Sequence, residues 1–309
     1  MKKIVSMFMT LCMLVCFFGM TALASSPNGK IVNIDTSKPF IALGADLTEE
    51  QKATVLGLMG LTINDLDNYN VVYITNEEEH KYLDSYVDAS VIGSKSLSSV
   101  LVTPAEEGHG VVVTTKNIDY CTTGMYRNAL LTAGVENTDI LVVGPTNISG
   151  TAGLIGALRA YEELTGEAVE DTVLDTALNE LVTTGEILNN NQSMSNEDVE
   201  ALVAFIKEKI AAGELESEED IRRAIEDGEE AFGVVLTEGD KEQIVQVMLK
   251  VKELNLDPNM LLDQAADLYE KYGDDILNHL ENEGFFDSLG SFFDSLGKSI
   301  GDFFAGLFG

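Results

Sequence analysis

Cysteine is scarce in this sequence, and its scarcity excludes one class of exported protein. Cys12 and Cys16 fall in an apolar N-terminal segment, so Cys121 is the only cysteine in the remainder. A single cysteine cannot form an intramolecular disulfide, so the chain is not a disulfide scaffold. Because no His is close to it in sequence, Cys121 is interpreted as a small buried hydrophobe rather than a catalytic thiol.

Basic residues are also scarce. The chain has 19 Lys and Arg against 52 Asp and Glu, for a formal net charge of −33, and 33 of the acidic residues lie in residues 169–309. So acidic a chain repels phosphate backbones, which argues against nucleic acid as a partner. Two interpretations stay open: a solvated surface that keeps the protein soluble, or weak binding of divalent cations or a basic partner. No other cofactor is predicted.

Familiar catalytic and metal-binding motifs are missing too. His80, His109 and His279 are not at zinc-ligand spacings, and the sequence has no Gly-x-Ser-x-Gly motif, P-loop or calcium loop. No catalytic residue and no metal ligand is therefore predicted. Because hydrolases can use two carboxylates far apart in sequence, these absences are only weak evidence against an enzyme.

The N-terminus, by contrast, has the layout of a secretory signal peptide. Lys2 and Lys3 are followed by an apolar run from Ile4 to Met20 and by the small-residue site Ala22-Leu23-Ala24. The apolar run is short for the ~20 residues of a membrane-spanning helix. Residues 1–24 are predicted to be removed on export, which predicts an extracellular or cell-envelope location.

Residues 25–168 alternate strand and helix signals, which predicts an α/β domain with a mixed sheet and flanking helices. A short strand is expected at 30–34, and the apolar run at 139–143 predicts a central strand buried on both faces. Two β-rich runs, 98–103 and 111–118, are joined by a loop of turn-forming residues and predict a β-hairpin.

Two helix starts are predicted in the α/β domain from capping residues. Thr48 and Gln51 have the spacing of a capping box. Asn76 precedes a polar helical segment and is expected to cap it.

After residue 168 the strand signals nearly stop and helix caps recur. Ser195, Ser217 and Thr237 are each followed by acidic residues, as favoured in the first turn of a helix. Residues 169–283 are therefore predicted to form an acidic helical region, with a linker at 189–193. Whether this region packs on the α/β domain stays open.

One stretch, 139–166, has a strand, a loop with glycine and a helix. Backbone N–H groups at the start of such a helix can hold an anion, which makes Ser149, Gly150 and Thr151 a candidate anion or ligand site. The structural alternative is that Ser149 caps the helix and that small residues from Gly153 onward let it approach the sheet closely. Both interpretations are kept.

Three stretches carry a resemblance to a known family: LGADLTEEQKATVLGLMG (43–60), MYRNALLTAGV (125–135) and SGTAGLIGALRAYEELTG (149–166). In this order they resemble the YpuA-like family of secreted proteins from Gram-positive bacteria, catalogued as domain of unknown function 1002. The resemblance covers about residues 30–275 and excludes the tail from Phe285 onward. It implies an exported protein of the cell envelope or medium and supplies no catalytic residues.

The C-terminal residues 284–309 form an unusually apolar tail in which three Phe pairs are spaced by Gly, Ser and Asp. At the helical period, its large apolar side chains fall within an arc of ~160°, which predicts an amphipathic helix. The apolar face would consist of Phe285, Phe286, Leu289, Phe292, Phe293, Leu296, Ile300, Phe303, Phe304, Leu307 and Phe308.

Three interpretations of this tail compete: a helix in a membrane interface, a helix packed on the protein or on a second copy through residues 285–309, and a weakly ordered end. Its polar face has one Lys and three Asp. Attraction to anionic lipid is therefore not expected, and the remaining Ser and Gly are typical of helices that sense lipid packing.

Together these features predict a non-enzymatic binding module of the cell envelope, associated peripherally with the membrane through the tail. The alternative is an extracytoplasmic hydrolase that acts on an envelope component through carboxylates not identified in the sequence. A deep cleft with converging, perturbed carboxylates would favour the enzyme, whereas a shallow surface would favour the binding module.

Overall fold

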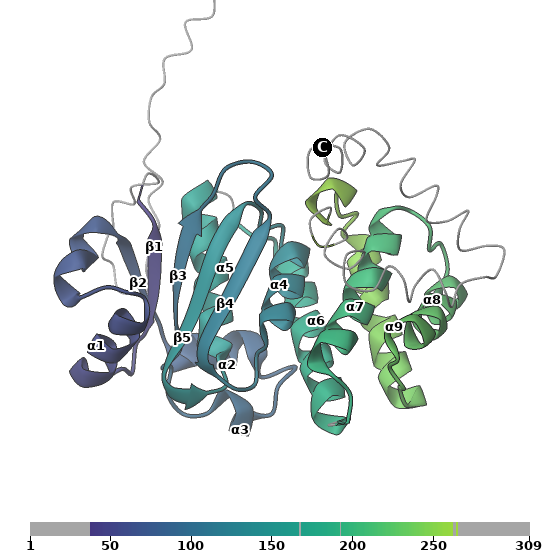
Figure 1. Cartoon of the computed structure of the whole chain (residues 1–309), viewed down its shortest axis with the longest axis horizontal. Helices are drawn as coiled ribbons and strands as arrows, with labels where there is room; N and C mark the ends of the chain where they lie inside the picture. The colour runs from purple at the N-terminus through teal and green to yellow at the C-terminus, as the bar shows by residue number, and fades with distance from the viewer. Residues whose placement is uncertain (1–37, 167, 192, 262–263, 265–309) are drawn as a thin grey trace, which may run out of the picture. The chain divides into compact units, whose positions relative to one another are not determined.

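The computed structural model in Figure 1 describes residues 38–166, 168–191, 193–261 and 264. The predicted signal peptide, the strand expected at 30–34 and the C-terminal tail lie outside the described residues. The strands are β1 (Phe40–Gly44), β2 (Asn70–Ile74), β3 (Ser99–Pro104), β4 (Val111–Ile118) and β5 (Thr138–Ile148).

These strands form one mixed sheet in the order β2-β1-β3-β5-β4, so the predicted mixed sheet is confirmed. The strand β3 is antiparallel to β1 and β5, while the β1–β2 and β4–β5 pairs are parallel. The predicted β-hairpin is wrong, because β5 lies between β3 and β4. Ile140, Val142 and Val143 are buried, which suits β5 to an internal position, whereas β4 alternates between buried or partly buried and exposed residues, as an edge strand does.

Helices cover both faces of the sheet. The helix α5 (Thr151–Thr165) packs on β1 and β3, and α1 (Glu49–Leu58) packs on the opposite face. A Cβ atom added at Gly153 would lie 2.4 Å from Val142 Cγ1 of β5, and Ala157 and Ala160 are buried, so the small-residue face predicted for this helix is confirmed. The other elements of this half are α2 (Asn76–Leu83), α3 (Ala89–Ile92), α4 (Thr123–Thr132) and the 3-10 helix Ile63–Asn68.

The two predicted caps in this half have different outcomes. The capping box of α1 is confirmed, since the backbone N–H of Gln51 donates to Thr48 and that of Thr48 to the Gln51 side chain. The cap of α2 is Thr75, one residue before the predicted Asn76. Thr75 occupies the cap position because Glu78, three residues later, completes a capping box with it.

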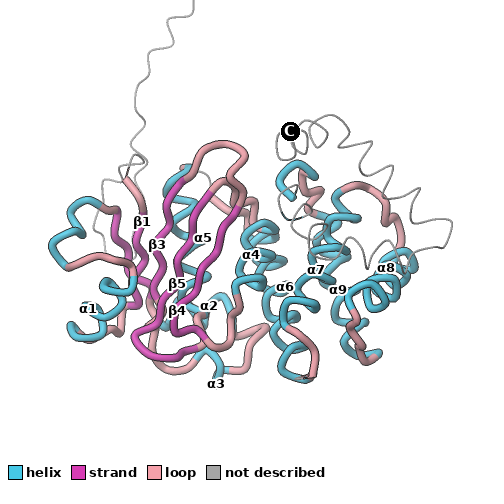
Figure 2. The backbone as a smooth tube through the Cα atoms, in the orientation of Figure 1, coloured by secondary structure: helices cyan, strands magenta, loops and turns pink. Residues whose placement is uncertain are grey.

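The second half is helical, as predicted, with α6 (Asp171–Asn190), α7 (Asn196–Ala211), α8 (Glu218–Phe232), α9 (Glu238–Glu253) and a 3-10 turn, Pro258–Leu261. Figure 2 shows the change from a region containing strands to helices alone. Ser217 and Thr237 form capping boxes, whereas Ser195 occupies the cap position without a side-chain hydrogen bond. The linker predicted at 189–193 overlaps the end of α6, because this helix continues to Asn190.

The helices α6 and α7 pack against α4 around a buried ion pair. Lys207 on α7 and Glu180 on α6 are 0% and 1% exposed, and the Lys207 Nζ lies 2.9 Å from Glu180 Oε1. The same ammonium donates to the backbone carbonyl of Asn128 on α4 at 2.8 Å, and Thr132 on α4 donates to Glu180. The division into two domains at residue 168 stays a prediction.

Candidate functional site

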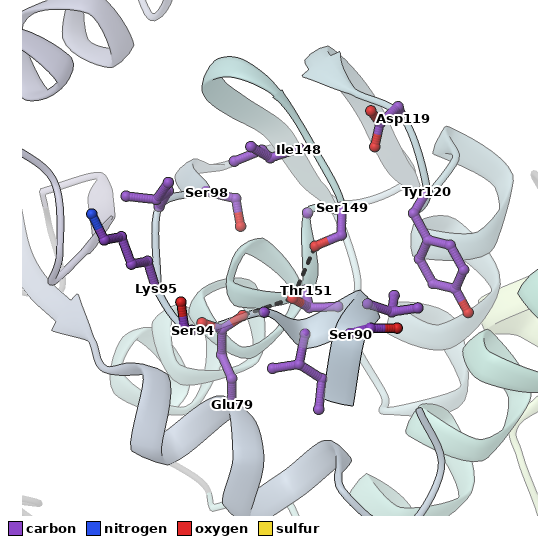
Figure 3. Close-up of a pocket in the computed structure, with 15 residues that line it drawn as sticks. Glu79, Ser90, Ser94, Lys95, Ser98, Asp119, Tyr120, Ile148, Ser149 and Thr151 are labelled. Carbon is purple, nitrogen blue, oxygen red and sulfur yellow. Dashed lines mark hydrogen bonds between the residues drawn. The ribbon is translucent and has the colours of Figure 1, made fainter. Parts of the chain in front are cut away.

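A cavity of about 460 Å³ lies beside the N-terminus of α5, and we call it the α5 cavity. Its lining comes from Glu79 on α2, most of residues 90–98, residues 119–120 and residues 148–151 (Figure 3). Its volume falls within the ~300–1,000 Å³ typical of small-molecule sites. The structure thus places Ser149, Gly150 and Thr151, the loop singled out in the sequence, on the wall of a cavity.

The loop before α5 is held from behind by buried groups. The carbonyl of Gly150 accepts a hydrogen bond of 2.6 Å from Tyr126, whose side chain is fully buried on α4. The Cys121 backbone N–H donates to the Ser149 carbonyl at 2.9 Å. Gly150 has φ +95° and a Cβ there would lie 2.4 Å from the Tyr126 hydroxyl oxygen, so this position requires glycine.

Ser149 does not cap α5, so that part of the sequence prediction is wrong. The cap position belongs to Gly150, which has no side chain to accept from the first turn. Ser149 Oγ instead lies 3.4 Å from Thr151 Oγ1. An N–H in the first turn, that of Gly153, donates to Ser98 Oγ at 2.8 Å, so a residue distant in sequence supplies the acceptor.

Glu79 lies on the floor of the α5 cavity and is 1% exposed. Its Oε1 accepts a hydrogen bond of 2.7 Å from Thr151 Oγ1. Burial raises the pKa of this carboxyl, and the Thr151, Ser96 and Asn76 side chains oppose that effect without cancelling it. Its Oε2 has no hydrogen-bond partner of acceptable geometry within the described part of the chain.

The rest of the cavity lining mixes hydroxyl groups with apolar side chains and one cation, the exposed Lys95. Ser90, Ser94 and Ser98 line one wall, and Asp119 is exposed opposite them. Burial raises the pKa of Tyr120 to about 12, so this phenol stays neutral. The lining thus combines several neutral hydroxyls with a small number of charged groups.

The wall formed by residues 90–98 is tied to α2. The Gly93 carbonyl accepts from Asn76 Nδ2 at 3.2 Å and from His80 Nε2 at 3.1 Å. On its other side, the Ser96 N–H donates to Asp46 Oδ2 at 2.8 Å. These contacts hold the wall opposite the loop that begins α5.

The geometry falls between the two outcomes set out from the sequence. The cavity is partly open to solvent rather than a deep cleft, and Glu79 is the only carboxyl among its described lining residues that is both buried and perturbed. No described group of three or more His, Cys, Asp or Glu residues is arranged to hold a metal ion. This arrangement suits the binding of a polar molecule.

Sequence reasoning missed Glu79. It is the third of three consecutive glutamates, Glu77 to Glu79, which have the composition of a solvated helix face. Only its position on α2, turned inward beneath Thr151, distinguishes it. The apolar face predicted for residues 285–309 lies beyond the described ranges, and none of the described helices is long and apolar enough to cross a membrane.

Comparison with known proteins places the sequence in a family. The model of a family described as "Protein of unknown function (DUF1002)" matches residues 43–268. "Uncharacterized protein YpuA" of Bacillus subtilis (strain 168) is 35% identical over 304 residues, which cover 97% of this chain and 98% of that protein. No solved structure matches. The resemblance seen in the sequence is confirmed, and the chain belongs to the DUF1002 family of proteins of unknown function.

Proposed function

We propose that this chain is an exported cell-envelope protein that binds a small polar molecule in the α5 cavity. The observation that carries the proposal is the buried Glu79 carboxyl on the cavity floor, whose Oε2 is without a partner in the described structure. A buried polar atom without a partner costs free energy of about 1–3 kcal/mol. A ligand that supplies the missing hydrogen bond recovers part of that cost on binding.

A thermal-shift screen of polar small molecules tests the proposal. Ligands of the cavity should raise the melting temperature of the wild type and of Glu77→Gln, which alters an exposed glutamate on the same helix. They should not raise that of Glu79→Gln, in which a carboxyl oxygen becomes an amide. Hits that stabilise all three proteins equally would place binding elsewhere and reject the α5 cavity as the site.

Catalysis by the same cavity is the second candidate function. A carboxyl whose pKa is raised by burial is suited to act as a general acid, and Asp119 is a second carboxyl in the lining. A hydrolase acting on an envelope polysaccharide should release new reducing ends, and both Glu79→Gln and Asp119→Asn should abolish that release. Release that survives both substitutions would exclude these carboxyls from the reaction.

Peripheral membrane association through residues 285–309 belongs to the same proposal. It is supported by the amphipathic pattern of the sequence alone. The full chain should float with neutral vesicles, and Phe293→Asp with Phe304→Asp should prevent flotation, whereas Ser291→Asp on the polar face should only weaken it. If deleting the tail breaks a dimer and leaves lipid binding unchanged, the tail serves self-association instead.

A further inference from the structure

We infer that the α5 cavity takes a neutral, polyhydroxylated ligand of the saccharide class rather than an anion. The inference rests on the proposed function, namely that a small molecule binds here. It follows from the direction of the hydrogen bonds around Glu79, Thr151 and Ser149.

The chain of hydrogen bonds begins at the buried carboxyl. Thr151 donates its hydroxyl hydrogen to Glu79 Oε1 at 2.7 Å. A threonine hydroxyl has one hydrogen, so Thr151 can only accept in its 3.4 Å contact with Ser149. Ser149 is therefore the donor in that contact. Its own hydrogen is used in the contact drawn in Figure 3, so it offers only lone pairs to the cavity.

The Ser98 hydroxyl has the opposite role: it can donate a hydrogen bond to a ligand. Its Oγ accepts from the Gly153 N–H at 2.8 Å, which leaves its hydroxyl hydrogen to donate. Figure 3 shows the Ser98 hydroxyl directed toward the same space as that of Ser149. The cavity therefore offers an acceptor at Ser149 and a donor at Ser98, with the unpartnered Glu79 Oε2 beneath them.

A hydroxyl-bearing ligand matches this pattern, because each hydroxyl both donates and accepts. Phosphate or sulfate mainly accepts hydrogen bonds, so it would find no hydrogen on Ser149 and would lie near the Glu79 carboxylate. Lys95, the cation in the lining, is exposed and can keep its ammonium in water. Ile92, Leu97 and Ile148 add apolar surface suited to the C–H face of a sugar ring. The anion interpretation of Ser149, Gly150 and Thr151 relies on backbone N–H groups at the start of α5, and one N–H of that first turn, that of Gly153, is already used by Ser98.

The test is nuclear magnetic resonance titration of the full chain near neutral pH with two kinds of probe. The first is N-acetylglucosamine and its β-1,4-linked disaccharide, and the second is inorganic phosphate. The saccharides should shift the backbone resonances of Ser149, Gly150 and Thr151, and phosphate should not. Glu79→Gln should weaken saccharide binding about tenfold, since it removes a hydrogen bond to a charged group.

Two further variants address the direction of the hydrogen bonds. Thr151→Val removes the hydroxyl that links Ser149 to Glu79 and leaves the Ser149 hydrogen free to donate. Phosphate should therefore bind this variant more tightly than it binds the wild type. Thr151→Ser keeps the hydroxyl and should retain the wild-type preference. If Thr151→Val does not fold, the preference of the wild type for saccharide over phosphate still decides the ligand class.

The outcomes separate this inference from the function on which it rests. Phosphate shifting the loop resonances in preference to saccharide at neutral pH would overturn the saccharide class and leave the cavity as a binding site. Saccharide binding that is unchanged in Glu79→Gln would also overturn it. If neither probe nor any molecule of a polar fragment library shifts these resonances, the proposed function is rejected as well.

Discussion

Three consecutive glutamates on α2 have the same chemistry and three different environments. Glu77 is exposed, Glu78 closes the capping box with Thr75 and pairs with Arg159 at 3.0 Å, and Glu79 is buried. The difference arises because successive residues of a helix point about 100° apart. Position on the helix, rather than residue type, therefore makes Glu79 the distinctive group of the cavity.

The buried Glu79 carboxyl should make stability fall as pH rises. Its pKa in the folded chain is raised above the ordinary 4.5, so the folded state keeps a proton that the unfolded state has lost. The stabilisation is present below 4.5 and is lost as pH rises through the folded value. Glu79→Gln cannot ionise and should flatten this part of the curve of urea midpoint against pH, whereas Glu77→Gln should keep it.

His80 is expected to show a second pH dependence. Its Nδ1 lies 2.6 Å from Asp84 Oδ1 and its Nε2 lies 3.1 Å from the Gly93 carbonyl, and both partners only accept. Both ring nitrogens must therefore carry hydrogen, and the hydrogen bond to Asp84 is the main cause that raises the pKa of His80, with the Glu79 charge adding to it.

The sign of this dependence follows from the raised pKa. The stabilisation from His80 is fully present below its ordinary value of 6.5 and is lost as pH rises through the folded value. Melting temperature measured across this range should fall in the wild type, and the fall should disappear in His80→Gln and shrink in Asp84→Asn. An identical fall in His80→Gln would show that another group titrates.

At the scale of elements, glycine has opposite effects in two helices. A Cβ at Gly156 of α5 would lie 2.9 Å from Val100 Cγ1 as well as close to Ala42, whereas a Cβ at Gly57 of α1 would meet nothing within 4 Å. Gly156→Ala should destabilise, because overpacking of about 1–3 kcal/mol exceeds a gain in helix propensity of up to ~1 kcal/mol. Gly57→Ala should gain stability in urea unfolding, and equal effects would contradict this account.

The junction of α4, α6 and α7 gives a further prediction. Lys207→Met would leave the buried Glu180 carboxylate without its cation and should cost about 3–5 kcal/mol. The double substitution Lys207→Met with Glu180→Leu removes both charges and should lose less than the single one. Urea unfolding of Lys207→Met, of Glu180→Leu and of the double variant measures these losses. A loss in the double variant equal to the sum of the two single losses would indicate that the charges do not interact.

An element could be predicted from the sequence when the interactions that form it join residues close together in the sequence. The capping box at Thr48 and the helix cap at Thr237 depend on residues within one turn and could be predicted. The place of β5 between β3 and β4 could not, because it depends on pairing between distant segments. The strand β1, Phe40–Gly44, was missed because a run of only four apolar residues cannot be distinguished from a piece of helix by its pattern. The candidate loop at 149–151 was found, whereas Glu79 needed the fold to bring α2 beneath it.

At the scale of the whole molecule, the net charge of −33 should make stability sensitive to salt. Added NaCl screens repulsion among the acidic groups and should raise the melting temperature. Weak divalent-cation binding remains a proposal with its own test. Ca²⁺ should raise the melting temperature more than Mg²⁺ at the same ionic strength if the acidic region binds it specifically. Equal shifts would leave screening as the whole effect.

The position of α4 has a consequence for how the two halves respond to each other. Through Tyr126 it holds the Gly150 carbonyl at the cavity, and through Asn128 and Thr132 it contacts the Lys207–Glu180 pair. These contacts lie within one helix of ten residues, about 15 Å long at 1.5 Å per residue. One helix therefore contacts both the loop of the cavity and the helices of the second half, so a ligand that displaces the loop would act on an element that also packs on α6 and α7.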